Sequence, residues 1–112
     1  MKLVLESRKS NNEYIQFEYL IRVERITVGN IIFRKYLNDK SNYLEYIYIE
    51  EDYRKNGYAK QALLALFKKQ KINPNLRLTV TQKSIKFWQC ILGIQIKDLN
   101  LIYKVYLKNL EI

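Results

Sequence analysis

The residues with the clearest chemical potential are Arg54-Lys55-Asn56-Gly57-Tyr58-Ala59, a short basic stretch between two segments of regular pattern. Apolar residues alternate before it and recur with helical spacing after it, so a helix is expected to start just beyond the end of a strand. The start of a helix presents unpaired backbone N–H groups and the positive end of the helix dipole. Gly57 lets the backbone bend and approach a ligand closely. The stretch therefore predicts an anion site, most naturally for phosphate.

The elements that position this stretch are a strand and a helix. The strand is expected over residues 43–49, where β-branched and aromatic residues dominate, and should be well buried. Its alternation places four residues on one face: Tyr43, Glu45, Ile47 and Ile49. The helix is expected from one apolar stripe: Ala59, Ala62, Leu63, Leu66 and Phe67.

The RKNGYA stretch resembles the R-x-x-G-x-G/A signature of the GCN5-related N-acetyltransferases (the GNAT superfamily), which also lies between a strand and a helix. This resemblance implies a GNAT-like fold and acetyl-CoA as co-substrate, with no metal. It implies that the backbone of Ile47, Tyr48 and Ile49 pairs with the pantetheine arm. It also implies a cradle for the pyrophosphate at the helix start, formed by Arg54, Lys55, Asn56, Gly57, Tyr58, Ala59 and Lys60. The alternative is an ordinary strand-to-helix turn that carries basic residues by chance.

A second similarity lies downstream. Residues 82–94 resemble the family segment N-x-x-A-x-x-F-Y-x-x-x-G-F, with Ile85, Trp88 and Gly93 at matching places. The family often has a tyrosine there that protonates the leaving thiolate, and this sequence has Gln89 at that place or, with one inserted residue, Trp88. Neither side chain donates a proton as a phenol does, so the usual general acid is absent. Trp88 is otherwise expected in the core.

Composition excludes several classes of protein. The 112 residues suit one domain, residues 1–112, with one core. The chain has no His and one Cys, which excludes a Ser-His-Asp triad, a His-ligated zinc ion, an internal disulfide and a thiolate metal cluster. Cys90 lies in an apolar helical context and is expected to be a buried, inert thiol. No apolar run approaches the ~20 residues that span a bilayer, and the N-terminus is unlike a secretion signal, so we expect a cytoplasmic protein without membrane contact.

The net charge of +9 suits several polyanionic partners, among them coenzyme A, nucleic acid, an acidic protein and a membrane surface. Lys and Arg are spread along the whole chain without a consecutive block, and no DNA- or RNA-binding motif is present. We therefore do not expect specific nucleic-acid binding.

The remaining pattern predicts an α/β (α+β) fold with a mixed, mostly antiparallel twisted sheet and two main helices. Strands are expected over residues 1–6, 14–24, 31–37, 43–49, 76–81, 94–97 and 100–112, and helices over residues 59–69 and 82–92. Turns are expected at residues 7–13 and 38–42, and a turn or bulge is expected at residues 27–30, around Gly29. The strand, helix and strand of residues 43–81 predict a parallel crossover with a cleft beyond the carboxyl ends of its strands.

One departure from the family concerns the acceptor side. GNAT enzymes usually have two helices after the first strand, and the seven polar residues Ser7–Glu13 cannot hold them. The resemblance then implies a minimal member with an open acceptor side. A homodimer partner or a large acceptor would supply the missing wall, or the wall would be absent.

Acetyl transfer to an amine needs a held thioester, a polarised carbonyl group and a base. Glu45 is the best candidate for the base, because a carboxylate on a mostly apolar strand has its pKa raised by desolvation. The alternative, to which we give equal weight, is that Glu45 lies on a solvated face of the sheet or pairs with a lysine of a neighbouring strand. For the general acid, Tyr103 or Tyr106 of the last strand are placeholders.

The first hypothesis is therefore an acetyl-CoA-dependent N-acetyltransferase. Its acceptor is a primary amine: a protein lysine, a protein N-terminus, a polyamine or another small amine. The alternative is a non-catalytic GNAT-like module that binds coenzyme A, a protein or a nucleic acid. A third hypothesis, a small basic nucleic-acid binder unrelated to GNAT, predicts salt-dependent oligonucleotide affinity and no coenzyme binding.

Overall fold

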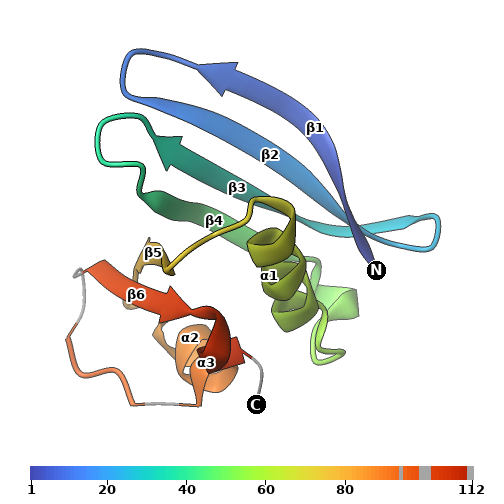
Figure 1. The fold of residues 1–112 in the computed structure, drawn as a ribbon. Coiled ribbons are helices and arrows are strands. Elements are labelled where there is room, and N and C mark those ends of the chain that lie inside the picture. Colours follow the sequence, from blue (N-terminus) through green and yellow to red (C-terminus); the bar gives the residue numbers. More distant parts are fainter. Residues whose placement is uncertain (94, 99–101, 111–112) are drawn as a thin grey trace.

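The computed structural model describes residues 1–93, 95–98 and 102–110, which form a six-stranded sheet with helices packed on it (Figure 1). The strands follow one another across the sheet in chain order: β1 (Lys2–Ser10), β2 (Tyr14–Val23), β3 (Ile26–Tyr36), β4 (Asn42–Ile49), β5 (Asn75–Thr79) and β6 (Ile102–Tyr106). Neighbouring strands are antiparallel except β4 and β5, which are parallel. The mixed, mostly antiparallel sheet predicted from the sequence is confirmed.

The two main helices are also confirmed. Helix α1 (Tyr58–Lys69) connects β4 to β5, and α2 (Ile85–Leu92) follows β5. A 3-10 turn, η1 (Glu51–Tyr53), precedes α1, and a short helix, α3 (Leu107–Leu110), follows β6 and contacts both α1 and α2. Within the described residues, no helix has the length and apolar character needed to span a bilayer.

The core lies between the helices and one face of the sheet. Helix α1 buries the predicted stripe Ala62, Leu63, Leu66 and Phe67, and α2 buries Trp88 and Leu92. The strands contribute alternate residues such as Ile31, Phe33, Leu76 and Leu78, each at most 1% exposed. Full burial of one such side chain stabilises the fold by about 1.5–3 kcal/mol. The opposite sheet face, called the open face below, carries Gln16, Arg34, Tyr43, Glu45 and Thr79, none of them fully buried.

Of the turn or bulge predicted around Gly29, the structure has the bulge: Gly29 lies inside β3 opposite Ile21, and the next ladder pair, Thr27 with Arg22, leaves Val28 without an opposite residue. The chain turns earlier, at Glu24 and Arg25, where Glu24 has a positive φ of 56°. A Cβ atom at position 29 would collide with the carbonyl oxygen of Tyr48 in β4. Glycine is therefore needed here for a close approach between two strands and not for a bend.

The turn predicted over residues 7–13 is shorter than expected, because β1 continues to Ser10. The side-chain oxygen of Asn11 accepts the backbone N–H groups of Glu13 and Tyr14, at 2.7 Å and 2.9 Å. This Asx turn reverses the chain in three residues. No helix lies between β1 and β2, as the sequence predicted.

The last third of the chain departs from several expectations. Residues 95–97 are not a strand, and the N–H of Ile96 instead donates to the side chain of Gln89 at 3.0 Å; Ile94 lies outside the described residues. The expected closing strand over residues 100–112 is shorter, because Asn109 accepts the N–H of Tyr106 at 2.8 Å and α3 begins; residues 100, 101, 111 and 112 lie outside the description. The closing strand pairs antiparallel with β5.

The second helix begins three residues later than expected, at Ile85, because Thr81 and Ser84 form a hydrogen-bonded turn before it. Gly93 ends it with a positive φ of 66°. The prediction of a buried Cys90 is wrong, since its thiol is exposed. Trp88 and Leu92 face the core, and a residue two positions after Trp88 points to the other side of a helix.

Candidate functional site

Strands β4 and β5 separate immediately after the point where they pair, which leaves a gap between them. The described residues contain one ladder pair between them, Tyr43 with Arg77. Farther along β4, Ile47 and Ile49 pair with β3 on one side only. The other edge of this β4 backbone faces the gap, so its polar groups are available to an extended ligand.

The loop after β4 is folded back on itself by its own side chains. The guanidinium of Arg54 donates from Nε to the carbonyl oxygen of Ile49 at 2.8 Å and lies over the ring of Tyr48. Asn56 donates from Nδ2 to the carbonyl oxygen of Tyr53 at 3.0 Å. These bonds fix the direction in which the chain enters α1.

The N-terminus of α1 has the features of an anion site. Gly57 precedes the helix with φ 77°, and among the described residues no side chain caps the helix start. The first turn holds no acidic residue, and Lys55, also at positive φ, is exposed beside it. The first N–H groups of any α-helix lack acceptors within the helix, so these groups suit a phosphate. The strand, loop and helix arrangement predicted for RKNGYA is thus present.

A β-bulge changes the faces of β4. Ile32 pairs with Tyr46 and Phe33 with Leu44, which leaves Glu45 without an opposite residue. The predicted strict alternation of residues 43–49 is therefore wrong: Leu44 and Ile49 are buried, while Glu45 is exposed. A bulge also turns backbone N–H groups out of the ladder.

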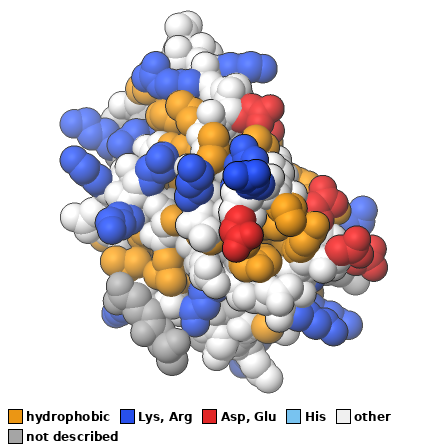
Figure 2. Space-filling view, turned by 90° about the vertical axis from the view of Figure 1, so that its right-hand side faces the viewer, with side chains coloured by type: hydrophobic (Ala, Val, Ile, Leu, Met, Phe, Trp, Pro, Cys, Tyr) orange, Lys and Arg blue, Asp and Glu red, His pale blue; other side chains and the backbone are white. Residues whose placement is uncertain are grey.

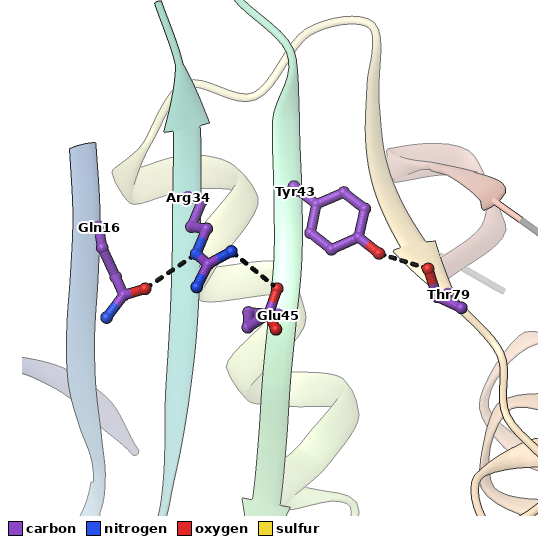
Figure 3. A network of polar contacts seen from close by, with 5 residues as sticks. All are labelled: Gln16, Arg34, Tyr43, Glu45 and Thr79. Carbon is purple, nitrogen blue, oxygen red and sulfur yellow. Dashed lines mark hydrogen bonds and ion pairs between the residues drawn. The ribbon is translucent and has the colours of Figure 1, made fainter. Parts of the chain in front are cut away.

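Glu45 lies in a polar network on the open face (Figure 3). Its carboxylate is 3.4 Å from Arg34, which also donates to the side chain of Gln16 at 2.9 Å and lies 4.4 Å from the ring centre of Tyr14. Partial burial lowers the pKa of Arg34, but the bond with Tyr36 and the charge of Glu45 outweigh it and raise the pKa. The Glu45 side chain is 40% exposed on this face and is not in the apolar surroundings expected for it.

The backbone arrangement is similar to that of a solved protein. The crystal structure of GCN5 from Tetrahymena matches with a TM-score of 0.61, over 87% of this chain and 70% of that chain. The fold is GNAT-like. The sequence identity is 14%, so the likeness concerns the fold alone. No protein-family model matches the sequence, and no curated protein matches it.

In this GNAT-like fold, Tyr103 lies away from Glu45. It is opposite Leu78, on the core face of the sheet, and its hydroxyl donates to the carbonyl oxygen of Asp98 at 2.8 Å. The other placeholder, Tyr106, is exposed near the start of β5, opposite Asn75. The structure therefore does not bring either tyrosine to the candidate base.

Two hydroxyl groups that the sequence analysis missed lie at the gap. The hydroxyls of Tyr43 and Thr79 are hydrogen-bonded across β4 and β5 on the open face (Figure 3). Because Tyr43 pairs with Arg77 in parallel register, Thr79 is level with Glu45. The pair thus stands beside the bulge. Sequence pattern could not reveal this, since it depends on the register between two separate strands.

An acidic hollow lies beyond the end of β4, lined by Thr27, Tyr48, Glu50, Glu51, Asp52 and Tyr53. Its carboxylates would repel phosphate. The side of the loop with Lys55 and the α1 N-terminus is therefore better suited to a phosphate than this hollow. Within the described ranges, no group of three or more carboxylate or thiol ligands is suited to hold a metal ion.

Proposed function

We propose that this chain is an acyltransferase that moves an acetyl group from acetyl-CoA to a primary amine. The observation that carries the proposal is one arrangement: the β4–β5 gap leads directly to the Arg54–Gly57 loop and the α1 N-terminus. An extended arm and a pyrophosphate need these two features side by side. The GNAT-like fold supports the assignment.

The proposed coenzyme contacts follow from the geometry. The edge of the β4 backbone at Ile47, Tyr48 and Ile49 that lacks a strand partner, apart from the Ile49 carbonyl oxygen that Arg54 occupies, pairs with the amides of the pantetheine arm as an added strand would. The N–H groups from Asn56 through Gly57, Tyr58 and Ala59 to Lys60 surround the pyrophosphate. Lys55 adds charge at its edge. Arg54 is already bonded to Ile49, so its contribution is to hold the loop in shape.

The proposed chemistry is direct transfer at the β4 bulge. The amine nitrogen forms a bond to the thioester carbon, whose oxygen is polarised by N–H groups at the bulge, and the carbon–sulfur bond breaks. Glu45 accepts a proton from the amine, and Arg34 holds its carboxylate on the open face. Tyr43 is better placed than Tyr103 to give the sulfur a proton, which solvent then restores through Thr79.

The acceptor is proposed to approach from the open face. The turn of residues 11–13 replaces the two wall-forming helices, so this side is unobstructed. A primary amine on a protein or on a small molecule fits such a side equally. A second copy of the chain, as a homodimer, is one way to complete the wall.

The first test is isothermal titration of the purified protein with acetyl-CoA, with dephospho-CoA as the comparison. We expect micromolar binding, about −8 kcal/mol. Release of free thiol is then measured with spermidine, a lysine peptide and a peptide with a free N-terminus as acceptors. Absence of binding heat and of a melting shift at high acetyl-CoA would refute the proposal.

A second candidate is a non-catalytic module that holds the coenzyme. It is favoured by two contacts, the ion pair of Glu45 with Arg34 and the occupied hydroxyl of Tyr103. Saturable acetyl-CoA binding without thiol release for any acceptor would support this candidate over the enzyme.

A further inference from the structure

The positive charge of this protein is segregated along the chain. Between Tyr53 and Lys97 the sequence has ten Lys and Arg residues and no Asp or Glu. The remainder has ten Lys and Arg residues and eleven Asp and Glu residues. The whole excess of positive charge therefore belongs to the segment that contains α1, β5 and α2. The absence of acids, and not a run of cations, is what separates this segment from the rest.

The structure places much of this charge on the helix-bearing side of the molecule. Five lysines at or next to the helices α1 and α2 are exposed: Lys68, Lys69, Lys71, Lys83 and Lys86. We call these five residues the basic surface. Figure 2 shows the face at the right-hand side of Figure 1: Lys and Arg are most numerous at the left of this view, while the acidic side chains in view lie at the centre and right.

The proposed coenzyme site does not account for this surface. Lys68, Lys69 and Lys71 are at the C-terminal end of α1, and the phosphates are proposed at its N-terminus. Eleven residues separate Tyr58 from Lys69, and at about 1.5 Å per residue the two ends of the helix are about 17 Å apart. Cations at a helix C-terminus do stabilise the helix dipole. That effect does not explain why the whole segment lacks acids.

The chemistry of the surface indicates what kind of partner it fits. The large hydrophobic side chains that are exposed on this protein all lie outside residues 53–97, as far as that segment is described. A stable protein partner needs apolar or aromatic residues at the centre of the interface. An interfacial membrane contact needs apolar side chains to insert. A phosphate backbone needs neither, because cations and counterion release supply the affinity.

We propose that the basic surface binds the sugar–phosphate backbone of a nucleic acid, independently of base sequence. Single exposed lysines contact single phosphates as point charges, and the missing acids remove repulsion along the path. The binding is separate from the coenzyme site and does not depend on acetyl transfer. Sequence motifs gave no sign of it, since backbone recognition requires no motif.

The test compares two variants that lose the same charge. K68Q/K69Q/K71Q removes three lysines of the basic surface, and K9Q/K40Q/K104Q removes three exposed lysines elsewhere. Fluorescence anisotropy with labelled single-stranded and duplex 20-mers, of at least two base sequences, measures affinity between about 50 mM and about 200 mM salt. Circular dichroism and acetyl-CoA titration check that both variants keep the fold and the coenzyme affinity of the unchanged protein.

We expect the basic-surface variant to lose about ten-fold or more in affinity and to lower the salt slope by about 2–3, while the control loses much less. Equal losses in the two variants would show that net charge alone drives binding, and would overturn the proposal. No binding at low salt, or equal binding of polyglutamate or of vesicles with anionic lipid, would also overturn it. Loss of oligonucleotide affinity with unchanged acetyl-CoA affinity would support it.

Discussion

Replacing Gly57 by glutamate tests the proposed pyrophosphate cradle most directly. Gly57 has φ 77°, where a residue with a Cβ atom costs about 1–2 kcal/mol. A Cβ atom there would meet nothing closer than the side-chain nitrogen of Gln61, at 3.7 Å, so strain and not collision sets the loss of stability. We expect the melting temperature of Gly57→Glu to fall by about 4–8 °C.

The added carboxylate should weaken coenzyme binding by more than this strain does. At about 5 Å from one phosphate charge, repulsion costs about 0.8 kcal/mol in a water-like medium and about 3 kcal/mol at an effective dielectric constant of 20. These energies correspond to about 4-fold and about 150-fold losses in acetyl-CoA affinity. Isothermal titration measures them directly.

Two controls separate charge from strain in this experiment. Gly57→Gln has the same bulk and the same backbone conformation without the charge. Gly93→Glu places a carboxylate at another glycine of positive φ, 66°, with open space around it. We expect Gly93→Glu to lose stability and keep its coenzyme affinity. An acetyl-CoA affinity of Gly57→Glu equal to that of Gly57→Gln would refute the cradle.

Three further predictions follow from single contacts. Tyr43→Phe should lower the rate of thiol release about ten-fold or more with unchanged acetyl-CoA affinity, whereas Tyr103→Phe should change the rate little. The reverse result would show that the proton donor is Tyr103 on β6. Gly29→Ala should destabilise the fold by about 1–3 kcal/mol or more in urea unfolding, because its methyl group collides with the Tyr48 carbonyl, and a neutral result would contradict the close β3–β4 approach. Burial raises the pKa of Tyr19 above 10.0, so the stability linked to it is complete below that pH and is lost as the pH rises; Tyr19→Phe should flatten this alkaline loss in unfolding experiments.

Local pattern was sufficient for β4, the basic loop and α1. The β-branched and aromatic residues of β4 and the apolar stripe of α1 are each concentrated within a few residues, so the existence of each element is specified by its own sequence. The same holds for the stop of α2 at Gly93, where a glycine after a periodic segment ends a helix. The candidate site could be predicted because these local signals meet at one place.

Non-local geometry accounts for the errors. For Gly29 the sequence left a turn or a bulge open, because glycine serves both, and only the partner strands show that it lies beside a bulge and in close contact with β4. The bulge at Glu45 depends on the register of β4 against β3, and the Tyr43–Thr79 contact depends on the register of β4 against β5. The alternation of residues within a single strand does not determine its register against a neighbouring strand.

One described ladder pair joins β4 to β5, so the sheet should separate most easily along the proposed cleft, a boundary that we call the seam. Strands β1 to β4 are joined by long ladders with one bulge or irregularity each, and β5 is joined to β6 by a ladder of five pairs, but Tyr43 with Arg77 is the described backbone pair that links the two groups. Backbone amide protons along this seam should therefore exchange with solvent through local openings of lower free energy than those within strands β1 to β4. A ligand that bridges the gap would join the two groups of strands and slow amide exchange on both sides. Coenzyme binding should therefore slow exchange in β5 and β6 without moving these strands.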